Sequence, residues 1–357
     1  MTVICRWMAT ACSESHRYSQ GCMGTNFTNR HAIEQVPVQR QAIDYDSIRE
    51  CFVGSDVEHV RLSNRTVGTA AMIGVALPGM DIEAGALSWA NITRGSTSRA
   101  HTTFVMAPES KDTYFNGAPA GPRRVHAWGP NTDLLDSAPP QTRFMVVSIE
   151  TETLEQSAAI LGSDDGFLAP GVARTYSGKM AERMLAVTES FVNTARDTPD
   201  TGVHPAVAER FGDSIVEQGL GMIGRREHAE APVRISRLAA LDIVMACDDY
   251  GSARRYQGIT SLGLSRAVWY SERRIRAAFK EVTGVSPMRF MRMRALHEIR
   301  RELLSGAAGS VTDAAFKWGL TELGRFARAY SDLFGELPSE TLRAGKHRST
   351  GAVLLTR

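Results

Sequence analysis

Residues 271–287 read SERRIRAAFKEVTGVSP, and residues 322–338, 51 positions further along the chain, read ELGRFARAYSDLFGELP. The residues between the matched positions differ, and several of them are long and polar. The chain therefore uses one structural unit twice, with the same shape and a different outward surface in each copy. With Arg274 aligned to Arg325, the matched pairs are apolar residues, an acidic residue, a glycine and a proline: Ile275/Phe326, Ala278/Ala329, Phe279/Tyr330, Glu281/Asp332, Val282/Leu333, Gly284/Gly335 and Pro287/Pro338.

Each copy predicts a helix that a glycine ends and a proline restarts. Glycine accepts the left-handed conformation that closes a helix, and proline suits the first position of the next helix. The same reading extended in both directions makes residues 232–357 almost entirely helical. The predicted helices are 234–248, 261–268, 272–282, 287–304, 311–318, 322–333 and 338–343.

Within each copy, a short helix, a tight turn and a second helix follow one another. Ser271 is a good N-cap for the second helix of the first copy. The outward face of that helix carries Arg273, Arg276 and Lys280, and Arg328 lies on the matching face of the second copy. A short helix that braces a basic helix across a tight turn is a helix-turn-helix unit. Arginine on such a helix can form two hydrogen bonds with a guanine in the major groove.

The predicted helix 287–304 joins the two units. A stiff connection places both basic helices on one face, where they can enter successive major grooves about 34 Å apart.

Charge is divided unevenly along the chain. Residues 232–357 hold 21 Lys and Arg against 12 Asp and Glu, a net charge of +9, and residues 1–231 hold 20 against 27, a net of −7; the two sum to the overall +2. Of the basic residues in the C-terminal part, 18 are Arg and 3 are Lys. This asymmetry is typical of a protein in which one part contacts a polyanion. A solvated charged surface is the alternative interpretation.

The front of the chain, from about residue 46 to residue 149, contains short β-rich runs separated by Gly, Pro, Asn and Ser. Runs at this spacing favour an antiparallel sandwich or barrel. They are VEHVRLS, TAAMIGVAL, GALSWANITR, HTTFVMA, RRVHAW and RFMVVSIE.

A helical block follows the β-rich part, beginning with a predicted helix over 150–161. Further on, Met180, Met184, Val187 and Phe191 form one helical stripe. A second apolar stripe with helical spacing lies between Pro205 and Gln218. Such stripes indicate core or a seam between helices, and a dimer contact is the other interpretation.

The cysteines and the hydropathy of the chain indicate the cellular compartment in which the protein is expected. The five cysteines have no zinc-ligand spacing, and their odd number argues against a disulfide framework. No apolar run approaches the roughly 20 residues that span a bilayer. The first residues are weakly signal-like, but Arg6 interrupts the apolar stretch, so we expect no export. A reduced, cytoplasmic protein with a flexible segment at 1–30 is expected.

Residues from about 235 to 343 resemble the DNA-binding domain of the AraC/XylS family of bacterial transcription regulators. The matching residues are SERRIRAAFKEVTGVSPMRFMRMRALHEIRREL and VTDAAFKWGLTELGRFARAYSDLFGELPSETL. The resemblance implies two helix-turn-helix subdomains, joined by a helix, that read one face of double-stranded DNA. By position, the DNA-binding residues that it implies, together with their neighbours on the same helix faces, are Ser271, Arg273, Arg274, Arg276, Ala277, Lys280, Leu323, Gly324, Arg325, Ala327 and Arg328.

The chain departs from the family pattern in both turns. The first turn has Trp269 where the family usually has glycine, and the second has Gly319-Leu320 where the family usually has Gly-Phe. The second recognition helix also presents mostly Leu, Gly and Ala. We therefore expect the first unit to carry most of the direct base readout.

Family members of this layout generally have an N-terminal cupin-like β-domain that senses a small effector and dimerises. The aromatic and histidine residues on the predicted strands are the candidate effector-pocket residues, although an ordinary core or surface position is the alternative for each. Glu83, His101 and His126 could form a metal site of the kind found in enzymatic cupins, but they lack the His-x-His spacing, so we predict no metal and no cofactor. The candidate pocket residues are Trp89, His101, Phe104, His126, Trp128 and Phe144.

The predicted fold class is α+β, with an N-terminal cupin-like β-barrel or sandwich, flanking helices, and a C-terminal all-α double helix-turn-helix domain. The predicted function is a sequence-specific transcription regulator, an activator rather than an enzyme, that acts as a homodimer with a small-molecule effector and RNA polymerase, away from membranes. One alternative is a front half that only dimerises; another is a cupin-type metal-dependent enzyme with a DNA-binding tail. The predicted segments are 1–30 (flexible), 31–165 (β-rich sensor), 166–223 (helical linker or dimerisation region), 224–233 (linker), 234–345 (DNA-binding) and 346–357 (flexible tail).

Overall fold

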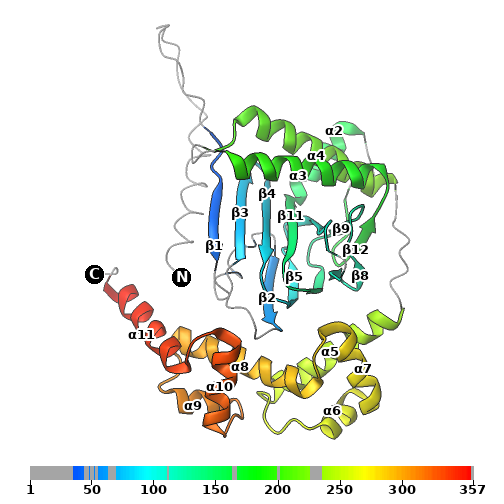
Figure 1. The fold of residues 1–357 in the computed structure, drawn as a ribbon. Helices are drawn as coiled ribbons and strands as arrows, with labels where there is room; N and C mark the ends of the chain where they lie inside the picture. Colours follow the sequence, from blue (N-terminus) through cyan, green and yellow to red (C-terminus); the bar gives the residue numbers. More distant parts are fainter. Residues whose placement is uncertain are drawn as a thin grey trace.

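The structure is a computed structural model of the 357-residue chain. The segment predicted to be flexible at 1–30 and most of the linker predicted at 224–233 lie outside the described residues. Figure 1 shows the elements in layers, with helices over two sheets and the C-terminal helices on the far side of the sheets. The residues described are 35–43, 48, 52, 55–62, 70–110, 112–162, 167–198, 202–225 and 235–354.

The larger sheet has seven antiparallel strands in the order β1-β3-β4-β11-β6-β9-β12. Its central strands are rich in β-branched and other apolar residues, and both faces are buried. The strands are β1 (Gln39–Ile43), β3 (Ala70–Leu77), β4 (Met80–Leu87), β11 (Thr142–Glu150), β6 (His101–Met106), β9 (Val125–Trp128) and β12 (Ala173–Tyr176).

The smaller sheet has five strands in the order β2-β5-β10-β7-β8. The two sheets pack face to face, so the sandwich form of the predicted fold class is confirmed. The predicted run 85–94 is divided by a bend at Ser88–Trp89, where the chain leaves β4 for β5 in the other sheet. The strands are β2 (Ser55–Arg61), β5 (Asn91–Thr97), β10 (Asp133–Ala138), β7 (Tyr114–Phe115) and β8 (Ala118–Pro119).

The outer face of the larger sheet is covered by the helices α2 (Thr151–Leu161), α3 (Lys179–Asp197) and α4 (Pro205–Arg225). The apolar stripe of α3 lies in this layer, where Phe191 stacks on Phe211 of α4 with ring centroids 4.0 Å apart. The stripe is therefore part of the core of its own chain. Because β12 pairs with β9 and both α3 and α4 pack on the sheet, these three elements form one packed unit with the sandwich.

The C-terminal part consists of helices joined by short turns, and the predicted and observed bounds differ by one or two residues for most of them. Two helices continue well past their predicted ends: α5 runs to 253 instead of 248, and α11 runs to 354 instead of 343, through most of the segment predicted as a flexible tail. The helices are α5 (Ile235–Ala253), α6 (Ser261–Val268), α7 (Glu272–Thr283), α8 (Pro287–Ser305), α9 (Val311–Lys317), α10 (Leu323–Phe334) and α11 (Pro338–Leu354). No helix in the described part of the chain is long and apolar enough to cross a membrane.

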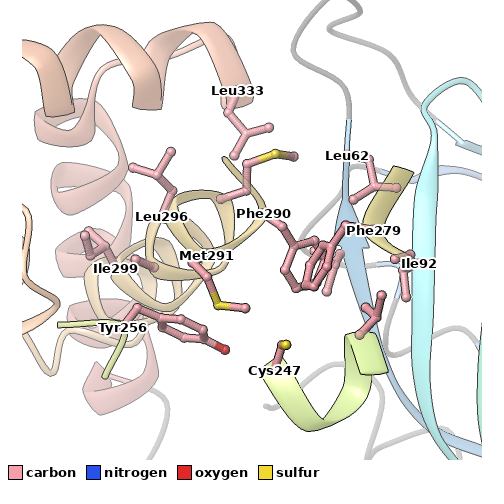
Figure 2. Packing of buried hydrophobic residues seen from close by; sticks show 14 of the residues in the cluster. Leu62, Ile92, Cys247, Tyr256, Phe279, Phe290, Met291, Leu296, Ile299 and Leu333 are labelled. Carbon is pink, nitrogen blue, oxygen red and sulfur yellow. The ribbon is translucent and has the colours of Figure 1, made fainter. Parts of the chain in front are cut away.

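The C-terminal core reaches the smaller sheet. Val60 and Leu62, at the end of β2, and Ile92 of β5 belong to the same buried cluster as Phe279 and Phe290. Figure 2 shows Leu62 and Ile92 at the side of this cluster, which continues through the side chains of α7 and α8. The sandwich and the helical part therefore share a continuous apolar contact.

Candidate nucleic-acid interface

The first repeated unit is formed by α6, a turn and α7. The hydroxyl of Thr260 accepts a hydrogen bond from the backbone N–H of Gly263 (3.0 Å), and the hydroxyl of Ser271 accepts one from the N–H of Arg274 (3.3 Å), so both helices have side-chain N-caps. Gly284 ends α7 with a φ of 70°, a left-handed conformation. Pro287 then begins α8, as the glycine-stop, proline-start pattern predicts.

The second unit repeats this arrangement with α9 and α10. Ser310 caps α9 by accepting a hydrogen bond from the N–H of Asp313 (3.0 Å). Gly335 ends α10 with a φ of 79°, and Pro338 begins α11. The two copies differ at the start of the second helix, because Glu322 at the N-cap of α10 makes no side-chain capping hydrogen bond. The sequence repeat is therefore a structural repeat.

The face of α7 that points away from the core is basic. Ile275, Ala278, Phe279 and Val282 are buried. The predicted DNA-binding residues of this helix are all exposed, and Arg276 forms an ion pair with Glu272 one turn earlier (3.0 Å). The exposed set is Ser271, Arg273, Arg274, Arg276, Ala277 and Lys280.

The corresponding face of α10 is smaller and less polar. Its buried face holds Phe326, Tyr330, Leu333 and Phe334. Arg325 pairs with Glu322 at 2.9 Å, in an exposed ion pair that contributes little to stability. The predicted residues Leu323, Gly324, Arg325 and Arg328 are exposed, and Ala327 is half-buried.

A cleft with a volume of about 110 Å³ opens at the turn before α10. The exposed Arg292 of α8 contributes to its wall together with Arg325 and residues 319–322. Arg292 is a basic residue beside the recognition helix that the sequence pattern did not single out. The helical period could have identified it: Arg292 and Arg294 are two residues apart, so they lie on opposite faces of α8, and Arg294 is buried.

Both units are fixed to α8. The hydroxyl of Tyr256 and the Nε of Arg294 both donate to Asp248 Oδ1, at 2.8 and 3.0 Å, which ties α8 to α5. Near the other end of α8, Arg300 donates to Glu336 Oε1 at 2.7 Å. Both recognition helices are therefore attached to the same helix, α8.

A charged contact joins α8 and α5 to the smaller sheet. The guanidinium of Arg294, only 4 % exposed, donates to both oxygens of Glu58 on β2, at 2.9 and 3.1 Å. Arg94 of β5 donates to Asp248 (3.1 Å) and to Asp249 (2.6 Å). Burial would raise the pKa of Glu58, but the charges of Arg294 and Arg301 outweigh it and lower the pKa to about 2. Glu58 is therefore ionised at neutral pH.

Four of the six candidate pocket residues face the space between the two sheets. Trp89, Trp128 and Phe144 belong to the buried cluster there. His126 contacts the ring of Phe115 edge-on, with centroids 4.9 Å apart. Burial lowers the pKa of His126 to about 3, so its ring is neutral at neutral pH.

The other two candidates lie elsewhere. Phe104 faces the opposite side of the larger sheet, under α4, where it approaches Gly219. His101 is partly exposed at the start of β6, with its Nδ1 3.0 Å from the hydroxyl of Ser98. Within the described residues, no group of three His, Cys, Asp or Glu side chains is arranged to hold a metal ion.

Comparison with known proteins identifies a helix-turn-helix family in the C-terminal part and several related regulators. A family model described as a helix-turn-helix domain matches residues 264–344. The XylDLEGF operon transcriptional activator of Pseudomonas putida is 39% identical over 172 residues, which are 46% of this chain and 52% of that protein. The probable thc operon regulatory protein of Rhodococcus erythropolis is 28% identical over 214 residues, which are 58% of this chain and 63% of that protein. The chain thus spans less than two thirds of the length of these curated relatives.

Among solved structures, a probable AraC family transcriptional regulator from Rhodopseudomonas palustris CGA009 is 40% identical; the match covers 97% of that chain and 29% of this one, with a TM-score of 0.27. The two curated relatives are named as a regulatory protein and a transcriptional activator, and they give the enzyme alternative no support. The helix-turn-helix model matches residues 264–344, which include α7 and α10 of the two units described above. The C-terminal part of the chain therefore carries the helix-turn-helix domain of the AraC/XylS family of transcription regulators.

Proposed function

We propose that this protein is a sequence-specific DNA-binding transcription regulator, acting as an activator, that reads successive major grooves with α7 and α10. The observation that carries the proposal is the exposed basic face of α7, on a helix that is capped, closed and fixed to α8. Helices presented in this way fit the major groove, and arginine can recognise guanine there. The names of the matched Pseudomonas putida relatives support the activator assignment.

The direct test is selection of bound DNA from a random duplex pool with the purified full-length protein at two salt concentrations. We expect an enriched motif that spans about two helical turns, because both units then read one face together. Binding that remains unselective and disappears as salt rises would mean that the units contact only phosphates, and the proposal would be wrong.

Removal of one arginine tests the direct readout. In Arg273→Ala, we expect affinity for the selected sequence to fall by about 1–3 kcal/mol, with relaxed preference at one or two base pairs, if the guanidinium binds a guanine. Arg183→Ala, at an exposed arginine of α3 on the opposite side of the sandwich, is the matched control and should leave affinity unchanged. An equal loss on all sequences would make Arg273 a phosphate contact.

The space between the sheets is the proposed effector site. His126 supports this assignment, because its buried Nε2 has no hydrogen-bond partner among the described residues, while its Nδ1 lies 3.1 Å from the hydroxyl of Thr175. A buried ring nitrogen without a partner is unfavourable. A small molecule that hydrogen-bonds to Nε2 and packs on Trp128 and Phe115 would remove that cost.

Thermal unfolding against a panel of small metabolites tests the effector site. A ligand that binds the folded state should raise the melting temperature as its concentration rises. His126→Leu should abolish this shift, and His101→Ala, at the histidine outside the sandwich interior, should keep it. A shift that survives in His126→Leu would place the ligand elsewhere.

The same proposal includes a homodimer that recruits RNA polymerase to DNA in the bacterial cytoplasm. Two copies would present four recognition helices to a promoter. Sedimentation of the protein with and without the selected duplex distinguishes a dimer from a monomer that binds alone.

A further inference from the structure

Trp269 ends α6 in an unusual state. Its φ is 58°, in the left-handed region, and its side chain is 92% exposed. A Cβ causes steric strain in this conformation, and glycine avoids it. The exposed indole also leaves a large apolar surface in water, so it adds nothing to the hydrophobic stabilisation of the fold. Folding of the free protein therefore accounts for neither feature.

The second unit shows what the turn itself requires. There the left-handed position is Gly319, with a φ of 77°, and a Cβ at that point would lie 3.0 Å from Gln257. The turn thus needs a left-handed residue in both copies, and one copy supplies it with glycine. A strained backbone that persists without a packing reason is a sign of a functional role.

The position of Trp269 indicates what the ring contacts. It lies two residues before Ser271, the N-cap of α7. The first residues of a recognition helix reach the base edges, so the turn before it borders the sugar–phosphate backbone of the same groove. Exposed arginines, Arg266 and Arg273, flank the ring on both sides in the sequence. The surroundings therefore favour a polyanion.

We propose that Trp269 is a DNA-backbone contact of the first unit. Its indole packs against a deoxyribose beside the groove that α7 enters, and its Nε1–H donates to a phosphate oxygen. This inference rests on the proposed DNA-binding function. An indole is a neutral donor, and a contact with sugar and phosphate carries no sequence information directly. Its loss should therefore weaken binding equally on all sequences without changing the salt dependence.

The test is the full-length Trp269→Gly variant, with affinity measured on the selected duplex and on an unselected duplex over a range of salt. We expect roughly five- to tenfold weaker binding on both, the size of one hydrogen bond with its apolar contact. The slope of log affinity against log salt should stay at the wild-type value, because no counterion-releasing charge is removed. Trp269→Phe keeps an aromatic ring but has no hydrogen-bond donor, so its affinity for DNA should lie between those of the wild type and Trp269→Gly.

Stability provides the internal control, because glycine relieves the left-handed strain. Trp269→Gly should melt at or above the wild-type temperature, so weaker binding cannot be ascribed to misfolding. Ile160→Ala, at an 85% exposed side chain of α2, removes comparable exposed apolar surface and should bind DNA like wild type. Duplex addition should also change the Trp emission of the wild type, and Trp269→Phe should lose most of that change.

Wild-type affinity in Trp269→Gly would overturn the inference. If that variant bound DNA normally and yet failed to activate transcription with RNA polymerase, the ring would serve a protein partner, and the DNA contact would again be excluded. If the wild type itself selected no DNA, the proposed function would fail together with this inference.

Discussion

Asp136 lies on β10, on the same side as Leu134, in the interior of the sandwich. Its Oδ1 accepts a hydrogen bond from the backbone N–H of Asn116 at 3.2 Å. Burial outweighs this bond and raises the pKa of Asp136 from 3.8 to about 8. The carboxyl is therefore mostly protonated at neutral pH in the folded protein, and ionised in the unfolded chain.

A folded-state pKa above the unfolded value means that stability is greatest below the unfolded pKa and is lost as pH rises toward the folded pKa. Asp136→Asn cannot ionise, so its stability relative to wild type should increase between pH 5 and 8, by roughly 1 kcal/mol per pH unit. Urea unfolding at several pH values measures this difference. A difference that does not change with pH would mean that Asp136 titrates normally.

Single residues also show what the sequence could predict of the candidate site. The exposed arginines of α7 followed from the helical period, because their neighbours Ile275 and Phe279 had to be buried. Phe104 could not be assigned, because alternate residues of a strand point to opposite faces and both faces of the larger sheet are buried. The role of Arg294 was equally hidden, since its partners Glu58 and Asp248 are far away in the sequence.

Elements were predicted best where local chemistry defines their ends. The C-terminal helices have their caps, glycines and prolines in the sequence, so most of their bounds were correct to within one or two residues. The short strands β1, β7, β8, β10 and β12 were missed, because two to six residues give too little alternation to recognise. The pairing of β2 with β5, and the order of both sheets, depends on contacts between distant segments.

The end of α7 offers a prediction at this scale. Gly284 has a φ of 70°, and an added Cβ would have nothing within 4 Å, so Gly284→Ala tests backbone strain alone. We expect it to lower the free energy of unfolding by about 1 kcal/mol. Gly212→Ala is the matched control: that glycine is also open, but it lies within the helix α4, and alanine should stabilise it by about 0.5–1 kcal/mol. Chemical denaturation measures the free energy of unfolding of both variants. If it changed in the same direction in both, the left-handed cap at Gly284 would be contradicted.

At the scale of the whole molecule, the ion pairs of Glu58 and Arg94 join the sandwich to the helical part. The pKa of Glu58 is lowered from 4.5 to about 2, so its contribution to stability is complete above about pH 5 and is lost as pH falls toward 2. The apolar contact through Leu62 and Ile92 does not depend on pH. Acid should therefore weaken this joint before it disrupts either core.

Glu58→Gln should lower the free energy of unfolding by about 2–4 kcal/mol at pH 7, because the buried guanidinium of Arg294 loses one of its two carboxylate partners. The variant should also lose part of the acid sensitivity between pH 5 and 2. Calorimetry should resolve a separate, earlier transition of the helical part. Glu155→Gln, at an exposed glutamate of α2, is the control and should behave like wild type. A single unchanged transition in Glu58→Gln would mean that the ion pair contributes nothing to the joint.

The helix α8 is continuous over 19 residues, about 28 Å at 1.5 Å per residue. Because each unit is fastened to it, the rise and the rotation between α7 and α10 cannot be adjusted independently. Under the proposed function, the promoters of this protein can then diverge by base substitution, at a graded loss of affinity. They cannot diverge by insertion or deletion between the two DNA segments that α7 and α10 contact. A single added base pair rotates one segment by about a tenth of a helical turn relative to the helix that binds it. The rigid connection thus determines which mutations a promoter can tolerate.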